Sequence, residues 1–197
     1  MAHDANSPSG SYTPEPRPSI LIAWGSSTGY TEEVANGLYD RLEPDVDAIV
    51  DIADTPVETL EDFDVLILGI PTWHVGELQD DWEDCFDQLL KLDLSGKLVA
   101  LFGCGDADGY PHNFQDAMGL LWRQVEGRGA SLVGKWPIEG YDFQQSEALT
   151  PDGNHFVGLA IDEHSQDELT AERLDRWAQQ LRTEVGERFR PRERVVA

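Results

Sequence analysis

The feature that most constrains the fold is an alternation of short apolar runs with amphipathic helical patterns. Uninterrupted apolar runs occupy residues 20–24, 65–70 and 98–102, and each is followed by a loop and then by apolar residues at helical spacing. Short apolar runs are typical of strands buried on both faces, and their alternation with helices indicates parallel pairing. The sequence therefore predicts an α/β domain in which helices cover both faces of a parallel sheet.

The remaining strand and helix signals complete the alternation. Residues 46–51 alternate as in an edge strand, and apolar runs at 131–133 and 156–161 are separated by a polar insertion that interrupts the last strand. Helical spacing of apolar residues is found at 34–42, 82–90, 114–125 and 169–185. A ligand is expected at the carboxyl ends of the strands, where the loops after the first, third and fourth strands meet.

The two ends of the chain differ from this core. Residues 1–18 are rich in Pro, Ser and Gly and are expected to form a disordered tail, and the basic segment 188–197 is expected to fray, which leaves 19–187 as the domain. No run approaches the ~18 apolar residues that a membrane helix needs. The two cysteines, Cys85 and Cys104, imply no disulfide framework, which fits a reducing cytoplasm.

The net charge of −24 is the most unusual bulk property. Residues 1–172 carry 34 acidic against 7 basic side chains, whereas residues 173–197 carry 4 against 7. Such a surface repels nucleic acid and anionic lipid, and it steers basic protein partners toward the molecule. Adaptation to a salt-rich cytoplasm explains the same composition, and the two interpretations are compatible. Charge alone therefore identifies no function.

The loop after the first strand, residues 25–31, has the composition of a phosphate site. It precedes a helix, whose N-terminus presents unpaired N–H groups to an anion. Tyr30 stands where a loop that binds nucleoside triphosphates needs Lys, and the Cys and Arg of a phosphatase loop are missing. The loop is either a polar turn that caps the helix or a cradle for a phosphate monoester without countercharge, with hydroxyl donors from Ser26, Ser27, Thr28 and Thr31.

Each of the other two loops carries an aromatic residue. Trp73 lies in segment 71–78, and Tyr110 ends the glycine-rich segment 103–110. Each side chain by itself could cover the hydrophobic core. Together they could sandwich a flat ring whose tail ends in the phosphate cradle, and FMN has this shape.

Five ordered segments resemble the flavodoxin family: residues 25–31, 71–78, 102–118, 136–143 and 156–162. The resemblance covers roughly residues 19–185, and the polar insertion is typical of the long-chain group. It implies a three-layer flavodoxin-like α/β fold, with a five-stranded parallel sheet of order 2-1-3-4-5, helices on both faces and a last strand interrupted by a long insertion. It also implies a monomeric, low-potential electron carrier, not an enzyme, that uses one noncovalently bound FMN.

Carried over to the matching positions, the resemblance assigns the FMN phosphate to the first loop and the two faces of the isoalloxazine ring to Trp73 and Tyr110. Backbone of the second and third loops would contact the polar edge of the ring, and three further polar residues would lie near the ring edge or the ribityl chain. The implied cofactor residues are Ser26, Ser27, Thr28, Gly29, Tyr30, Thr31, Pro71, Thr72, Trp73, His74, Val75, Gly76, Cys104, Gly105, Asp106, Tyr110, Asn113, Gln115 and Asp162. The implied partners are a ferredoxin–NADP⁺ reductase-type flavoenzyme and low-potential acceptors with basic docking faces.

Three of these positions have more than one possible role. In flavodoxins a peptide after the Trp rotates on reduction; here it is His74–Val75, and β-branched Val75 resists the positive φ that a rotated peptide favours. His74 replaces an Asn that is common in related long-chain sequences, and it is either an exposed side chain or a group whose protonation makes the potential pH-dependent. Cys104 either packs or serves as a redox thiol, and the lack of a second Cys nearby favours packing.

Two other functions fit parts of the pattern. An FMN-dependent NAD(P)H:quinone reductase of related fold needs a nicotinamide site, which the acidic surface and the two aromatic residues disfavour. A response-regulator-like module needs acidic residues where segment 25–27 follows the first strand. His112, His155 and His164 are isolated loop residues, and neither a metal-ligand spacing nor a catalytic Ser-His-Asp or Cys-His pattern has sequence support.

Overall fold

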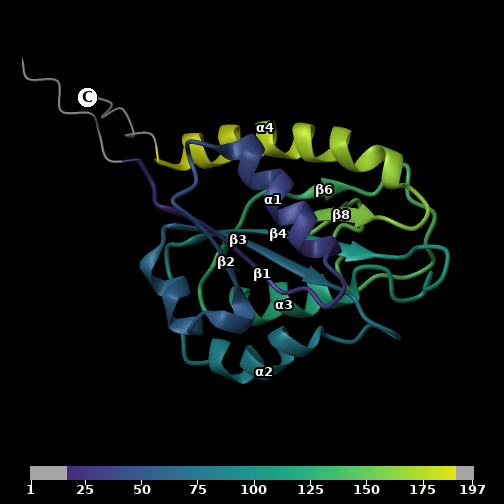
Figure 1. Cartoon of the computed structure of the whole chain (residues 1–197), viewed down its shortest axis with the longest axis horizontal. Coiled ribbons are helices and arrows are strands. Elements are labelled where there is room, and N and C mark those ends of the chain that lie inside the picture. The colour runs from purple at the N-terminus through teal and green to yellow at the C-terminus, as the bar shows by residue number, and fades with distance from the viewer. Residues whose placement is uncertain (1–16, 190–197) are drawn as a thin grey trace, which may run out of the picture.

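The computed structural model describes residues 17–189 and shows a three-layer α/β architecture (Figure 1). Its main sheet has the order β2-β1-β3-β4-β5 with parallel pairing, which confirms the predicted fold class. Helices α1 and α4 cover one face of the sheet, and α2 and α3 cover the other (Figure 1). The elements are β1 (Ile20–Trp24), α1 (Tyr30–Leu42), β2 (Ala48–Asp51), η1 (Ile52–Asp54), η2 (Val57–Asp62), β3 (Val65–Pro71), α2 (Asp80–Leu89), β4 (Leu98–Gly105), α3 (Asp116–Glu126), β5 (Ser131–Leu132), β6 (Trp136–Pro137), β7 (His155–Phe156), β8 (Leu159–Asp162), η3 (Asp167–Leu169) and α4 (Thr170–Phe189).

The described residues extend slightly into both predicted tails. At the start, Arg17 is bonded to the folded domain, and at the end α4 continues to Phe189. The remaining residues of the two predicted tails, 1–16 and 190–197, lie outside the described residues. Within residues 17–189, no helix has both the length and the apolar character that crossing a bilayer requires.

The two central strands are apolar on both faces because helices cover both sides of the sheet. The first six residues of β3 and the first seven of β4 are buried, whereas the residues of the edge strand β2 are half-buried. Gly69 of β3 makes room for the ring of Phe102 on β4, since a Cβ atom at Gly69 would lie 2.1 Å from that ring. Each fully buried side chain of this size contributes roughly 1.5–3 kcal/mol to the folded state.

One backbone carbonyl group joins the core to the loops at the carboxyl end of the sheet. The indole Nε1 of the fully buried Trp82 on α2 donates a hydrogen bond to the carbonyl oxygen of Gly69 at 2.9 Å. The backbone N–H of Gly25, directly after β1, donates to the same oxygen at 3.1 Å. The start of the first predicted loop is therefore fixed to β3 and to α2.

The last strand is interrupted as predicted. Both β5 and β8 pair with β4 in parallel: β5 lies beside residues 98–99 and β8 beside residues 102–105. Between them, the insertion forms an antiparallel hairpin of β6 and β7. Gly158 lies close to β4, because a Cβ atom there would be 2.1 Å from the carbonyl oxygen of Leu101.

The second apolar run, residues 156–161, is divided between two sheets. Phe156 belongs to the hairpin, and only residues 159–162 join the main sheet. The reason is an aromatic cluster in which the rings of Phe114, Tyr141 and Phe143 lie 5.2–5.8 Å from the ring of Phe156. Phe114 was predicted to belong to the following helix but lies before it, because Gln115 adopts a φ of 66° and α3 begins only at Asp116.

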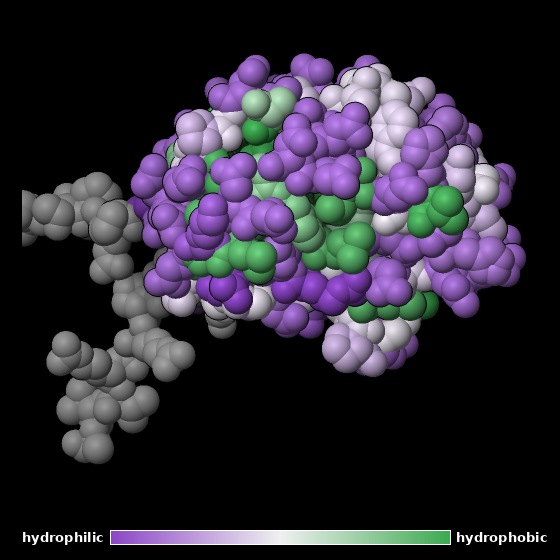
Figure 2. Space-filling view, turned by 90° about the horizontal axis from the view of Figure 1, so that it is seen from below, coloured by the Kyte–Doolittle hydropathy of each residue, from purple (hydrophilic) through white to green (hydrophobic). Residues whose placement is uncertain are grey.

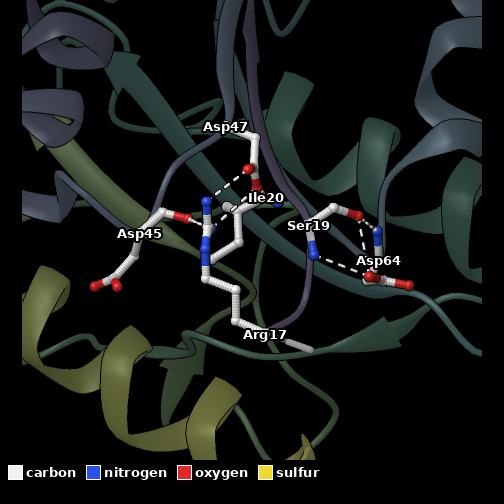
Figure 3. Close-up of polar contacts among 6 residues, drawn as sticks. All are labelled: Arg17, Ser19, Ile20, Asp45, Asp47 and Asp64. Carbon is white, nitrogen blue, oxygen red and sulfur yellow. Dashed lines mark hydrogen bonds and ion pairs between the residues drawn. The ribbon is translucent and has the colours of Figure 1, made fainter. Parts of the chain in front are cut away.

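A polar network ties the start of the described chain to the amino ends of the strands (Figure 3). The guanidinium of Arg17 donates to both carboxylate oxygens of Asp47, at 2.7 and 3.2 Å, and the N–H of Ile20 donates to the same carboxylate at 2.8 Å. Ser19 and Asp64 form a second set of hydrogen bonds beside it. The Ile20 N–H, and next to it Arg17, hold the pKa of Asp47 below its ordinary value.

Replacing Asp47 by Asn is expected to lower the free energy of unfolding by about 1 kcal/mol at neutral pH, since a partly exposed charged acceptor becomes neutral. Because the folded-state pKa lies below the unfolded one, this contribution is present above about pH 4 and is lost as the pH falls through the folded-state value. Urea unfolding of both proteins measures the difference, which should shrink between about pH 7 and pH 3. A difference that stays constant over this range would contradict the assignment.

Candidate cofactor site

The three predicted loops meet at the carboxyl end of the sheet and enclose a groove of about 330 Å³, a volume suited to a small molecule. It lies where the strand order reverses between β1 and β3, which is the usual ligand position in such sheets. Ten of its twelve lining residues were predicted, and the other two come from the loop after β8. The lining residues are Thr28, Tyr30, Pro71, Thr72, Trp73, His74, Cys104, Gly105, Asp106, Tyr110, Glu163 and His164.

The first loop offers hydrogen-bond donors at the N-terminus of α1. Gly29, with a φ of 92°, leads into the helix, and its N–H donates to the hydroxyl of Ser26 at 3.0 Å. Thr31 is buried, and its Oγ1 has no hydrogen-bond partner among the described residues. Gln79 donates to the hydroxyl of Ser27 at 3.2 Å. A helix N-terminus beside an unsatisfied hydroxyl favours an anion at this position.

The two predicted aromatic residues line the same groove. Trp73 is half-buried, and Tyr110 is 44% exposed. Trp73 is held in a tight turn by two backbone hydrogen bonds with Glu77, of 3.0 and 2.8 Å. The backbone N–H of Tyr110 donates to the carbonyl oxygen of Asp106 at 3.0 Å. Both aromatic side chains are therefore anchored through their own loops.

The turn after Trp73 contains two residues with positive φ. Positive φ values fall on His74, at 45°, and on Gly76, at 88°, and not on Val75. The side chain of Val75 is 70% exposed, and neither Val75 nor Gly76 lines the groove. Gly76 is required here, because a Cβ atom would lie 2.7 Å from the carboxylate of Asp116.

Three predicted residues lie beneath the groove and do not line it. The fully buried carboxylate of Asp162 accepts hydrogen bonds from the N–H of Ala107 and the hydroxyl of Ser165, at 3.2 and 2.6 Å. The buried Nε2 of Gln115 donates to the carbonyl oxygen of Ile161 at 3.0 Å. Asn113 donates to the carboxylate of Asp116 at 2.9 Å. Asp162 therefore joins the loops after β4 and β8, Gln115 joins the start of α3 to β8, and Asn113 fixes the start of α3 locally.

Glu163 and His164 are site residues that the sequence analysis missed. They follow directly after β8, so they belong to a fourth loop at the carboxyl end of the sheet. The ring of His164 lies edge-on to that of Tyr30, with 6.2 Å between the centroids. The signal was present in the sequence, since a loop that follows the second half of the last strand must end at this same edge.

Cys104 packs in the wall of the groove. It is 7% exposed, and burial raises the pKa of its thiol to about 12, so the thiol stays protonated at neutral pH. Burial likewise raises the pKa of Cys85 to about 11. Both cysteines are free. The structure therefore favours packing over a redox role, because thiol reactivity requires the thiolate.

The surroundings of the groove are acidic. None of its twelve lining residues is Lys or Arg, whereas Asp106 and Glu163 are among them. An adjoining hollow of about 280 Å³ shares Trp73 and His74 with the groove and adds Glu77, Asp80 and Glu83. The face formed by α2 and α3 is mostly hydrophilic with small apolar patches (Figure 2).

A cavity of about 240 Å³ at the opposite end of the sheet has a different character. It lies at the amino ends of β1 and β3 against α4, and its walls are mainly apolar, for example Ile20, Val65 and Leu181. None of the predicted site residues lines it. The groove at the carboxyl end is therefore the candidate site.

Known proteins provide an independent comparison. The family model described as Flavodoxin matches residues 22–177. Flavodoxin 1 of Escherichia coli K12 is 51% identical over 164 residues, which cover 83% of this chain and 93% of that protein. The flavodoxin of Picosynechococcus sp. is 49% identical over 168 residues, which cover 85% and 98% of the two chains.

A solved structure agrees with these sequence relatives. The crystal structure of Fusobacterium nucleatum flavodoxin bound to flavin mononucleotide matches with a TM-score of 0.79 and 27% identity, over 85% of this chain and 98% of that one. The sheet order and the interrupted last strand follow the same architecture. This chain belongs to the flavodoxin family, in its long-chain group.

Proposed function

We propose that this flavodoxin carries single electrons at low potential on one noncovalently bound FMN, held in the groove between Trp73 and Tyr110. The observation that carries the proposal is the convergence of these two side chains, from separate loops, on a groove that Thr28 and Tyr30 of the hydroxyl-rich loop also line. The family consists of electron-transfer proteins rather than enzymes, which sets aside the quinone reductase of related fold. FMN, when bound, supplies the one-electron chemistry.

The donor set of the first loop fits a phosphate monoester. The buried hydroxyl of Thr31 has no partner among the described residues, and the N-terminus of α1 adds N–H donors and a positive dipole end. No lining residue supplies a Lys or Arg countercharge. The residues that would hold the phosphate are Ser26, Ser27, Thr28, Gly29, Tyr30 and Thr31.

The remaining lining residues fit a flat aromatic ring. Trp73 and Tyr110 would stack on its two faces and exclude water from it. Backbone groups of the two loops that carry them would contact the polar edge, with Pro71, Thr72, His74, Val75, Gly76, Cys104, Gly105 and Asp106 as the candidates. Asn113, Gln115 and Asp162 would act indirectly, because they hold these loops in place.

Removing either aromatic wall is expected to weaken FMN binding. Base–aromatic stacking contributes about 1–3 kcal/mol, so Trp73→Ala and Tyr110→Ala should each raise the dissociation constant roughly 10- to 100-fold. Quenching of flavin fluorescence on titration with apoprotein measures this constant. Trp73→Phe is the matched control and should retain most of the affinity. Unchanged binding by both Ala variants would rule out the sandwich.

We infer the low potential from the charges that surround the groove. Reduction adds negative charge close to Asp106 and Glu163, and no Lys or Arg in the lining offsets the charge of the phosphate. Two unit charges ~10 Å apart at an effective dielectric constant of ~20 repel each other by roughly 1.7 kcal/mol before screening. The protein therefore opposes the second electron, which makes the fully reduced state a strong donor.

Neutralising these two carboxylates is expected to raise the midpoint potential of the second one-electron step. For Asp106→Asn with Glu163→Gln, the shift should be on the order of tens of millivolts at low salt and smaller at high salt. Both substitutions preserve an acceptor for the hydrogen bonds from the Gly109 N–H and the Thr170 hydroxyl. Potentiometry measures the shift, and Glu58→Gln, an exposed residue outside the groove, is the control. Equal shifts in the control and the double variant would argue against a local effect.

His74 holds the turn beside Trp73 at an energetic cost. Its φ of 45° lies in the left-handed region, which costs most residues about 1 kcal/mol but is tolerated by Asn and Gly. His74→Asn should therefore keep or raise the free energy of unfolding, whereas His74→Val should lower it by about 1 kcal/mol. Urea unfolding of the apoprotein tests this. Val75→Asn is the control: this neighbouring position is exposed and has no positive φ, so an equal gain in the free energy of unfolding there would contradict the strain argument.

The partners of this protein are other redox proteins. We propose a ferredoxin–NADP⁺ reductase-type flavoenzyme as the donor and low-potential proteins as acceptors, each with a basic docking face. The net charge of −24 and the acidic hollow with Glu77, Asp80 and Glu83 beside Trp73 support this choice. We also propose that the protein is a monomer. The two free cysteines fit a reducing cytoplasm, where both thiols stay reduced.

A further inference from the structure

The loop after β8 brings a histidine next to the hydroxyl-rich loop. His164 lines the cofactor groove together with Thr28 and Tyr30. Its ring lies edge-on to the ring of Tyr30, with 6.2 Å between the centroids and 63° between the planes. Tyr30 is the first residue of α1, whose N-terminus belongs to the cradle assigned to the phosphate. An imidazole is therefore positioned beside the phosphate end of the groove.

The backbone of this loop is held firmly. The carboxylate of Asp162 accepts hydrogen bonds from the N–H groups of His164 and Ser165, at 3.1 and 3.0 Å. The carboxylate of Glu163 accepts a hydrogen bond from the hydroxyl of Thr170 at 2.7 Å, which ties the loop to the start of α4. The imidazole of His164 is exposed, so its protonation requires no rearrangement of the core.

The other charged or titratable groups at the groove come from every neighbouring loop. They are Glu163 and the buried Asp162 from the same loop, Tyr30 from α1, His74 from the loop after β3, Cys104 from β4, and Asp106 and Tyr110 from the loop after β4. Among the twelve lining residues, His74 and His164 are the ones that can become cationic near neutral pH. His74 lies beside Trp73, with 5.7 Å between the rings, at the wall assigned to the isoalloxazine. The cation available to the phosphate is therefore that of His164.

We propose that His164 is a positioning residue that binds the phosphate of FMN when its imidazole is protonated, and that it thereby makes phosphorylated flavin bind more tightly as the pH falls. This inference rests on the proposed function. The direction of the pH dependence follows from linkage. A cation that gains an anionic partner in the complex holds its proton more tightly there, so FMN binding takes up protons and becomes stronger at lower pH.

The test compares FMN and riboflavin binding to the full-length apoprotein by fluorescence titration. The phosphate group loses its second proton near pH 6, an effect that all variants share and that the ratio of dissociation constants removes. His164→Gln should bind FMN about three- to tenfold more weakly than wild type near pH 6 and equally well near pH 8.5, as expected for one partly exposed charge pair. Riboflavin, which has no phosphate, should bind equally to both proteins at each pH.

Two further variants sharpen the comparison. His164→Lys keeps a positive charge at both pH values, so near pH 8.5 it should bind FMN more tightly than wild type does. His155→Gln is the matched control: it makes the same chemical change in β7, outside the groove, and should follow the wild-type pH profile.

The outcomes separate this inference from the proposed function. If FMN binds and the profiles of wild type and His164→Gln run parallel, the role of His164 is overturned while FMN binding stands. If His164→Gln weakens riboflavin binding as much as FMN binding, His164 acts on the shape of the groove, and the phosphate assignment is overturned. If wild type binds neither flavin, both the proposed function and this inference fail.

Discussion

The rest of the structure depends on the close contact between β3 and β4 at Gly69. Because Gly69 has no side chain, the ring of Phe102 packs directly over its backbone and closes the centre of the sheet. The carbonyl oxygen of the same residue accepts hydrogen bonds from Trp82 and from the N–H of Gly25. One residue of the core thus sets the position of α2 and the first turn of the hydroxyl-rich loop. The geometry of the cofactor groove therefore depends on the packing of Phe102 against Gly69 in the sheet below it.

The groove combines two electrostatic requirements that appear opposed. An anion must be bound, and yet the lining holds two carboxylates and no Lys or Arg. In the proposed binding mode, neutral donors and a helix N-terminus would resolve the conflict, because they would stabilise the phosphate locally without cancelling the negative field at the ring. A lysine in this loop would strengthen phosphate binding at every pH, but its positive charge would also stabilise the reduced flavin. A phosphate site without Lys or Arg would therefore favour a low redox potential, at some cost in affinity.

The fold and most of the groove could be predicted from the sequence because both depend on local patterns. Uninterrupted apolar runs identified β3 and β4, and the resemblance of three loops to the flavodoxin family named ten of the twelve lining residues. The features that were not predicted depend on long-range contacts: Phe156 packs in an aromatic cluster instead of joining the main sheet, and the carboxylate of Asp162 joins two loops. The positive φ of His74 could not be predicted from the sequence either, because it follows from the closure of the turn and not from the residue type.

The arginines at the end of the chain show how composition and architecture are connected. The sequence concentrates basic residues after residue 172, and three of them, Arg173, Arg176 and Arg182, make specific contacts from α4. Arg173 lies over the ring of Tyr141 at 4.2 Å and Arg176 over that of Trp136 at 5.0 Å, so the insertion is fixed to α4 by cation–π interactions. Arg182 pairs with Asp45 at 3.0 Å at the other end of the helix. In a chain of net charge −24, these three cations meet nearby carboxylates and aromatic faces, and none of them lines the groove. The charge asymmetry therefore serves the folded structure, because the arginines fix α4 to the insertion and to the loop before β2.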